Sequence, residues 1–233
     1  MPVPLKDLIK SYDILVRGID SKAHDDENRA YGGIVRAGKG LLVESIAKHL
    51  VEIAWHQLGE PSSRLSFDRE TVKIPLNRPY IARIKSREVA EYITEHIDEY
   101  TYGLKTDIHV AIDGSFVIGV ECKAYTENAM LKRILVDFTL LRHVFPALKC
   151  VLVQLESQLT GDYSQLSKEV IYGSRSTHTI LSYFDIDLNI ITLLEGERHV
   201  DKPIHKKEYF KPLQEPHMQR AADALQDLLR EFV

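Results

Sequence analysis

The chain has 233 residues, 44% of them hydrophobic and 27% charged, and a formal net charge of −4. This composition is typical of an ordinary soluble globular protein, and the acidic balance argues against a generally basic nucleic-acid-binding protein. Because no apolar run approaches the about 20 residues of a membrane helix and the first residues lack a signal-peptide pattern, we expect no membrane association and a cytoplasmic location.

The first half of the chain predicts two helices and one strand. Residues 20–40 are polar and contain glycines, which favours a loop. Residues 41–58 predict a strongly apolar helix that is buried on much of its surface. A short strand is expected at 71–76. An amphipathic helix is expected over 86–100, with Ser86 as its N-cap.

In the second half the hydrophobic period changes to two, which is typical of strands. Asp113-Gly114 is a hairpin signal between two such segments. Thr126 is the expected N-cap of the helix that follows them. The succession predicts an α/β fold with a central mixed β-sheet flanked by helices. The expected elements are strands at 106–112 and 115–123, a helix at 126–145, a buried strand at 150–155, a strand at 187–194 and a helix at 216–232.

The register of this hairpin follows from its apolar residues, because opposed residues share one face of a sheet. A two-residue loop would place the two apolar sets on opposite faces. A three-residue loop at 113–115 places both sets on one face. It opposes Ile112 to Phe116, Val110 to Ile118 and Ile108 to Val120, with Cys122 continuing the same face.

The other face of the hairpin then carries charge. Asp107 lies opposite Glu121, and Lys123 is on the same side as Glu121, as is His109. Opposed residues have Cβ atoms about 4.5–5.5 Å apart, so the two carboxylates repel unless a proton or a cation lies between them. A Mg²⁺ ion shared by carboxylates and a substrate phosphate fits this arrangement.

Asp107 followed by Glu121-Cys122-Lys123 at the end of an apolar hairpin strand, and then by a helix and a buried strand, resembles the PD-(D/E)xK nuclease superfamily, which includes most type II restriction endonucleases. The resemblance covers residues 41–155. It implies that Asp107 and Glu121 bind the metal ion and that Lys123 positions or activates water. Thr106 stands where the family name has proline. The family often adds an acid from the preceding helix, and Glu44 is the candidate; an ordinary surface pair with Lys48 is the alternative.

Two basic segments favour contact with a polyanion in one cleft, although a solvated loop is an equal alternative for either alone. Between Arg64 and Arg87 there are seven basic residues and two acids, and a second basic run spans 202–211. The polar segment 173–179 has side chains suited to base edges or phosphates. The candidate DNA contacts are Arg36, Lys39, Arg78, Arg83, Lys85, Arg175, Thr177, His178, Lys206 and Lys207.

We therefore expect a Mg²⁺-dependent type II restriction endonuclease that cuts double-stranded DNA as a homodimer. The expected organisation is a single nuclease domain over 1–233. Its catalytic core spans 41–155, and recognition and dimerisation elements lie in 1–40, 60–87 and 160–233. A repair or junction-resolving nuclease of the same superfamily and a non-catalytic DNA-binding module are the alternatives.

Other chemistries have weaker support. The segment Gly33–Gly40 nearly fits a phosphate-binding P-loop, but Gly40 replaces the required Ser or Thr and no strand precedes it. Cys122 and Cys150 are the only cysteines and lie in apolar runs, so neither a zinc site nor a cysteine nucleophile is favoured.

Overall fold

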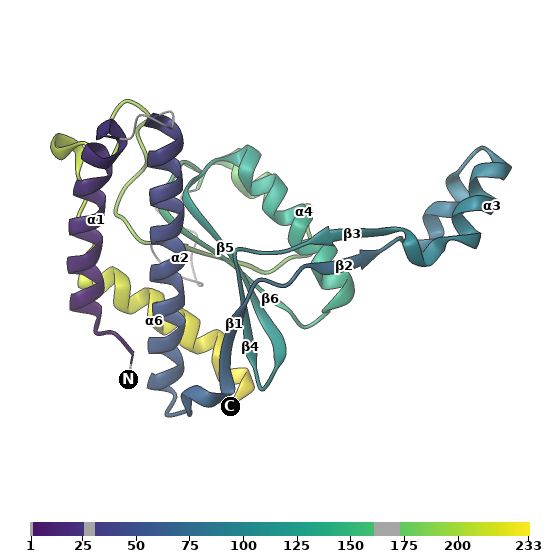
Figure 1. The fold of residues 1–233 in the computed structure, drawn as a ribbon, viewed down its shortest axis with the longest axis horizontal. Coiled ribbons are helices and arrows are strands. Elements are labelled where there is room, and N and C mark those ends of the chain that lie inside the picture. The colour runs from purple at the N-terminus through teal and green to yellow at the C-terminus, as the bar shows by residue number, and fades with distance from the viewer. Residues whose placement is uncertain (1, 26–30, 161–172) are drawn as a thin grey trace.

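The computed structural model describes residues 2–25, 31–160 and 173–233. Its centre is a five-stranded sheet with the strand order β1-β4-β5-β6-β7 (Figure 1). Strand β4 is antiparallel to β1 and to β5, whereas β6 and β7 continue the sheet in parallel with β5. This confirms the predicted α/β fold with a mixed sheet. The strands are β1 (Leu65–Asp68), β4 (Ile108–Ile112), β5 (Ser115–Thr126), β6 (Lys149–Ser157) and β7 (Leu188–Thr192).

Helices cover both faces of this sheet (Figure 1). On one face lie α1 (Leu5–Asp25), α2 (Tyr31–Gln57) and α6 (Glu215–Leu229), and on the other lies α4 (Asn128–Val144), with the short α5 (Arg175–Leu181) against it. In the part of the chain that the structure describes, no helix has the length and apolar character needed to cross a bilayer. Short 3₁₀ turns occupy Ser62–Arg64, Arg78–Arg83, Ile97–Glu99, Lys207–Tyr209 and Arg230–Phe232.

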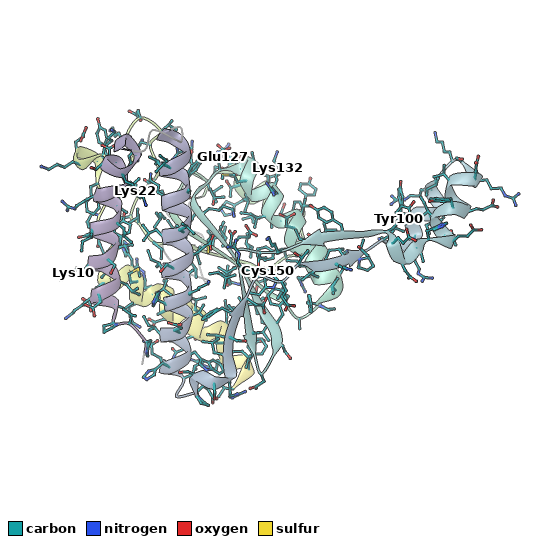
Figure 2. All side chains as sticks on the ribbon, in the orientation of Figure 1. Lys10, Lys22, Tyr100, Glu127, Lys132 and Cys150 are labelled. Carbon is teal, nitrogen blue, oxygen red and sulfur yellow. The ribbon has the colours of Figure 1, made fainter. Side chains whose placement is uncertain are left out.

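The two faces of the sheet carry separate hydrophobic cores. The first joins α1, α2 and α6 to the sheet and includes Trp55, Ile108 and Cys122. The second lies beneath α4 and includes Cys150 of β6, which is near the middle of the molecule in Figure 2. The predicted inward stripe of α4 is confirmed, because all its members are buried: Leu131, Ile134, Leu135, Phe138 and Leu141.

A two-stranded ribbon leaves this body and carries a helical tip. Strands β2 (Val72–Pro75) and β3 (Thr101–Leu104) form the ribbon, and α3 (Arg87–Glu95) lies in the tip. We call residues 72–104 the arm. It projects away from the sheet in Figure 1, and beyond Tyr100 its side chains point outward in several directions in Figure 2. The predicted cap of α3 is confirmed, since the Ser86 side chain accepts a hydrogen bond from the Val89 amide.

The turn of the β4–β5 hairpin differs from the prediction. Asp113 and Gly114 both have positive φ angles, 50° and 79°, and form a two-residue turn in which Ile112 pairs with Ser115. A β-bulge then shifts the register, so that Val110 still pairs with Ile118 and Ile108 with Val120. The bulge restores the predicted register at the end of the hairpin that carries the acids.

Three local predictions are wrong. The loop expected over 20–40 is helical where it is described: residues 20–25 end α1 and 31–40 form the first turns of α2, while 26–30 lie outside the described residues. The rest of α1 occupies a segment for which no helix was predicted. The bulge moves Phe116 away from the first core and toward α4, where it stacks on His109. Thr126 ends β5, and Glu127 is the residue that precedes α4.

Candidate active site

The topology brings three segments of the chain to one end of the sheet. Because β4 runs opposite to β1 and β5, Arg69 after β1, Asp107 before β4 and the second half of β5 share this end. Strand β5 extends six residues beyond Val120, which pairs with the first residue of β4. In the described part of the chain this edge of β5 has no partner strand beyond Val120, so side chains can occupy it.

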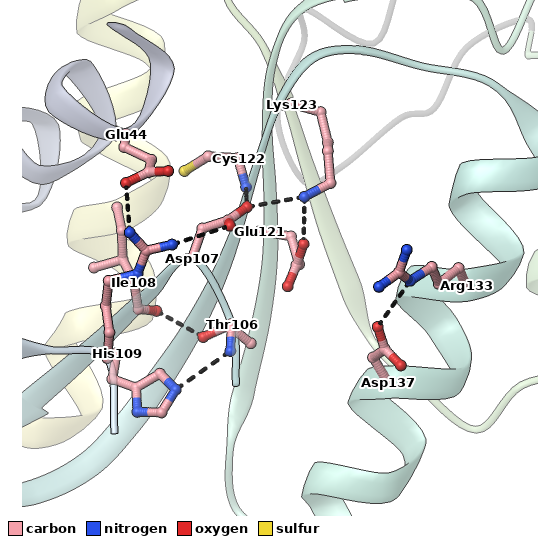
Figure 3. A network of polar contacts seen from close by, with 11 residues as sticks. Glu44, Thr106, Asp107, Ile108, His109, Glu121, Cys122, Lys123, Arg133 and Asp137 are labelled. Carbon is pink, nitrogen blue, oxygen red and sulfur yellow. Dashed lines mark hydrogen bonds and ion pairs between the residues drawn. The ribbon is translucent and has the colours of Figure 1, made fainter. Parts of the chain in front are cut away.

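Asp107 occupies this free edge. Its Oδ2 accepts a hydrogen bond of 2.7 Å from the backbone amide of Cys122, in place of the next bond of the β ladder. The same oxygen lies 2.9 Å from Lys123 Nζ, and Glu121 Oε2 lies 2.5 Å from that nitrogen (Figure 3). The three residues predicted to share one face therefore converge on one point, with the lysine ammonium between the two carboxylates.

Burial shapes the charges in this cluster. Glu121 is only 8% exposed, and burial raises the pKa of its carboxyl group to about 7; Lys123 opposes the rise and Asp107 adds to it. Burial alone would lower the pKa of Lys123, but the two carboxylates reverse this and raise it above its ordinary value. Lys123 is thus an ammonium group held by two acids, and Glu121 is an acid with a pKa of about 7.

The residues present fit a divalent ion. Two carboxylates already share a single cation, so their oxygens can reach one metal ion. Across residues 2–25, 31–160 and 173–233 no group of three or more His, Cys, Asp or Glu side chains forms a ready metal cage. Mg²⁺ is commonly held by one or two carboxylates, and water and phosphate oxygens fill its remaining coordination positions. Zinc sites usually have three or four protein ligands, which is more than the two carboxylates offer.

Glu44 approaches the same cluster from α2. Its Oε2 lies 3.3 Å from Nη1 of Arg69, and Nη2 of that arginine lies 3.7 Å from Oδ1 of Asp107. The dashed lines from Glu44 and Asp107 in Figure 3 meet on this guanidinium. Glu44 is thus one side chain removed from Asp107 and stands beside Arg69.

His109 lies on the predicted face, but its ring contacts the backbone of Thr106, the residue before Asp107. Its Nε2 accepts a hydrogen bond of 3.3 Å from the Thr106 amide, and its Nδ1 lies 3.0 Å from Asp68. The side chain is buried, and burial lowers the pKa of the imidazole despite Asp68. A neutral ring with its proton on Nδ1 satisfies both contacts.

Two residues of this site were missed from the sequence. Arg69 was counted only as part of a basic segment. Asp137 of α4 faces Glu121 and Lys123 in Figure 3, and its pKa is raised by burial while Arg133, 3.7 Å away, opposes the rise. The sequence signal that could have indicated Asp137 is its position on the predicted helix, one residue before the inward-facing Phe138.

The candidate DNA contacts are spread over several elements. Arg78, Arg83 and Lys85 are exposed on the arm. Arg175 and His178 are exposed on α5, and Lys207 is exposed near the C-terminal part of the chain. The backbone of Arg36 lies in α2, but its side chain is outside the described residues.

The remaining three candidates are less available to DNA. The Thr177 hydroxyl is buried and lies 2.8 Å from Oδ1 of Asn128 and 3.0 Å from the Leu159 carbonyl oxygen, the two acceptors for its proton, so it has no surface to offer DNA. Lys206 pairs with Asp20 of α1 at 2.8 Å. Lys39 belongs to a helix rather than a loop, and burial lowers the pKa of its amine although Glu156 opposes this.

Comparison with known proteins identifies the class to which this fold and site belong. The sequence is 51% identical to the type II restriction enzyme DdeI of Desulfomicrobium norvegicum over 233 residues, 98% of this chain and 97% of the relative. The chain therefore belongs to the type II restriction enzymes, a family of DNA endonucleases.

The other comparisons add little. No family model matches the chain. A solved structure described as the native BbvCI A2B2 tetramer aligns with 97% of this chain and 84% of its own at 11% identity, with a TM-score of 0.35. A TM-score of this size does not establish a shared fold.

Proposed function

We propose that this restriction endonuclease is a member of the PD-(D/E)xK superfamily that hydrolyses double-stranded DNA with Mg²⁺ held by Asp107 and Glu121. The observation that carries the proposal is the convergence of both carboxylates on one cation at the free edge of β5. When bound, the metal ion would stabilise negative charge that develops on the scissile phosphate.

The roles of the protein groups follow from their contacts. The Cys122 amide fixes Asp107, so this carboxylate is positioned before any ligand arrives. Lys123, whose pKa is raised, remains an ammonium group and donates hydrogen bonds. It would therefore orient the attacking water or hold a phosphate oxygen, rather than act as a base.

The exposed basic residues of the arm are the best candidates for DNA contacts. Arg78, Arg83 and Lys85 are exposed there, and a ribbon of this length can follow a phosphate backbone. We assign DNA contacts to these three residues first, then to Arg175, His178 and Lys207. Cutting both strands of a symmetric site calls for two active sites, so we propose a homodimer.

The restriction relative favours this reading over a repair or junction-resolving nuclease and over a non-catalytic DNA-binding module. The test is incubation of the purified protein with plasmid DNA and Mg²⁺. Discrete fragments with identical ends support the proposal. Selective cutting of branched or damaged DNA would instead support a repair role, and no cutting with Mg²⁺, Mn²⁺ or Co²⁺ would support a binding module.

A further inference from the structure

Arg69 joins two acids that come from different elements at this end of the sheet. Glu44 is carried by α2, and Asp107 precedes β4. The arginine lies between them, with its two terminal nitrogens 3.3 Å from Glu44 and 3.7 Å from Asp107. Asp107 is therefore shared: Oδ2 belongs to Lys123 and Cys122, and Oδ1 faces Arg69.

The two cations of the site are held differently. Lys123 lies 2.5 Å and 2.9 Å from its carboxylates and is mostly enclosed. The Arg69 side chain is 45% exposed, and its contacts are longer than the 2.7–2.9 Å typical of charge-assisted hydrogen bonds. Of the two cations, Arg69 is therefore the more exposed and the more loosely held, and the easier one to displace.

The charges around Arg69 explain both its position between Glu44 and Asp107 and its displacement by a metal ion. Without a cation, the carboxylates of Glu44 and Asp107 would face each other uncompensated. A divalent ion on Asp107 would meet a guanidinium already beside the same carboxylate, and like charges at this distance repel. Arg69 and the metal ion therefore compete for the negative charge of the same carboxylate, that of Asp107.

We propose that Arg69 is a positioning residue that holds Glu44 and Asp107 together in the DNA-free protein, yields to the divalent ion, and then binds a DNA phosphate. This inference rests on the proposed role of Asp107 as a metal ligand. A guanidinium on an exposed side chain is well suited to the last step, because its planar fork matches phosphate oxygens.

The test is Mn²⁺ binding to the DNA-free, full-length protein, followed by the electron paramagnetic resonance signal of free Mn²⁺. Arg69→Gln removes the competing charge, so we expect Mn²⁺ to bind about three- to tenfold more tightly than to the wild type. The same variant should bind a DNA fragment more weakly in Ca²⁺. Arg69→Lys keeps the charge and should stay near the wild-type Mn²⁺ affinity.

A matched control is Arg230→Gln. Arg230 is also exposed and lies 3.3 Å from one carboxylate, that of Asp227, but it belongs to the C-terminal end of the chain. Neither Mn²⁺ nor DNA binding should change in this variant. A loss of local order would weaken Mn²⁺ binding, so tighter binding by Arg69→Gln distinguishes competition from a structural role.

Asp107→Asn tests the proposed metal site separately from the role of Arg69. If Asp107→Asn loses Mn²⁺ binding while Arg69→Gln binds Mn²⁺ no more tightly than the wild type, the Arg69 inference is overturned and the proposed metal site stands. If Asp107→Asn binds Mn²⁺ as the wild type does, both are overturned.

Discussion

The carboxyl group of Glu121 illustrates how burial sets the chemistry of this site. It lies against Lys123, yet burial raises its pKa to about 7, above the 4.5 of an unfolded glutamate. Because the pKa of Glu121 is higher in the folded than in the unfolded protein, protonation of this carboxyl group contributes to the free energy of unfolding. This contribution is fully present below pH 4.5 and is lost as the pH rises through about 7 in the metal-free protein.

Metal binding should show the opposite dependence on pH, because a metal ion needs the deprotonated carboxylate. With a pKa of about 7 for Glu121, Mn²⁺ should bind about tenfold more weakly at pH 6 than at pH 8. Isothermal titration calorimetry in buffers of different ionisation enthalpy would measure both the affinity and the proton released. Equal affinities at the two pH values, with no proton release, would refute this assignment of Glu121.

The sequence placed site residues correctly wherever strand alternation decided which face of the sheet a side chain occupies. Asp107, Glu121 and Lys123 were placed together because the apolar residues between them could face only one core. Arg69 could not be placed in the same way. It meets Glu44 across 25 residues of chain, and no periodic pattern relates a helix residue to a residue that follows an edge strand.

Among the secondary-structure elements, Gly119 of β5 controls how closely α4 approaches the sheet. A Cβ atom at this position would lie 3.0 Å from Phe138 of α4 and 3.3 Å from Thr106, the residue before Asp107. Gly119→Ala should therefore lower the free energy of unfolding by about 1–3 kcal/mol through overpacking, and it should slow cleavage. Chemical denaturation and single-turnover cleavage measure the two effects.

Gly18→Ala provides the contrasting variant. Gly18 lies inside α1, and a Cβ atom there would meet nothing within 4 Å. Alanine should raise the free energy of unfolding by about 0.5–1 kcal/mol, because it restricts the unfolded chain and suits a helix. A Gly119→Ala protein as stable and active as the wild type would show that α4 does not depend on this close approach.

The hairpin shows why element boundaries were harder to predict than faces. The register at the site was predicted correctly from a three-residue turn that does not exist. A two-residue turn and a bulge give the same pairing of Ile108 with Val120. The apolar pattern fixes which residues must meet in the core, but several combinations of turn and bulge satisfy it.

The arm is the main feature of the whole molecule that sequence patterns did not reveal. Its segments were predicted separately, as a strand at 71–76 and a helix at 86–100, but β3 was not expected and nothing indicated that they project from the body. The helix predicted at 41–58 forms most of α2, but α1 and the first turns of α2 were missed. The glycines at positions 32, 33, 38 and 40 suggested a loop, whereas packing of α2 against α1 and α6 favours a long helix.

The proposed role of the arm can be tested through the salt dependence of DNA binding. Replacing Arg78, Arg83 and Lys85 together by Ala should reduce the slope of log K against log salt by about 2–3, roughly one for each lost phosphate contact. Folding should persist, since all three side chains are exposed. Fluorescence anisotropy with a DNA duplex in Ca²⁺, over a range of NaCl concentrations, measures the slope.

The control lies on the same arm. Glu88, Glu91 and Glu95 are exposed on α3, and their replacement by Gln alters charge without removing a cation. This variant should keep the wild-type salt slope. An unchanged slope in the basic-residue variant would remove the arm from the DNA interface.

Lys123→Ala tests the proposed cleavage centre of Asp107, Glu121 and Lys123. Single-turnover cleavage of a plasmid in Mg²⁺ should be abolished in this variant, while a gel-shift assay in Ca²⁺ shows that it still binds DNA. This outcome follows because Lys123 contacts both carboxylates and lies at the end of β5. A Lys123→Ala protein that cuts the plasmid at the wild-type rate would contradict the account.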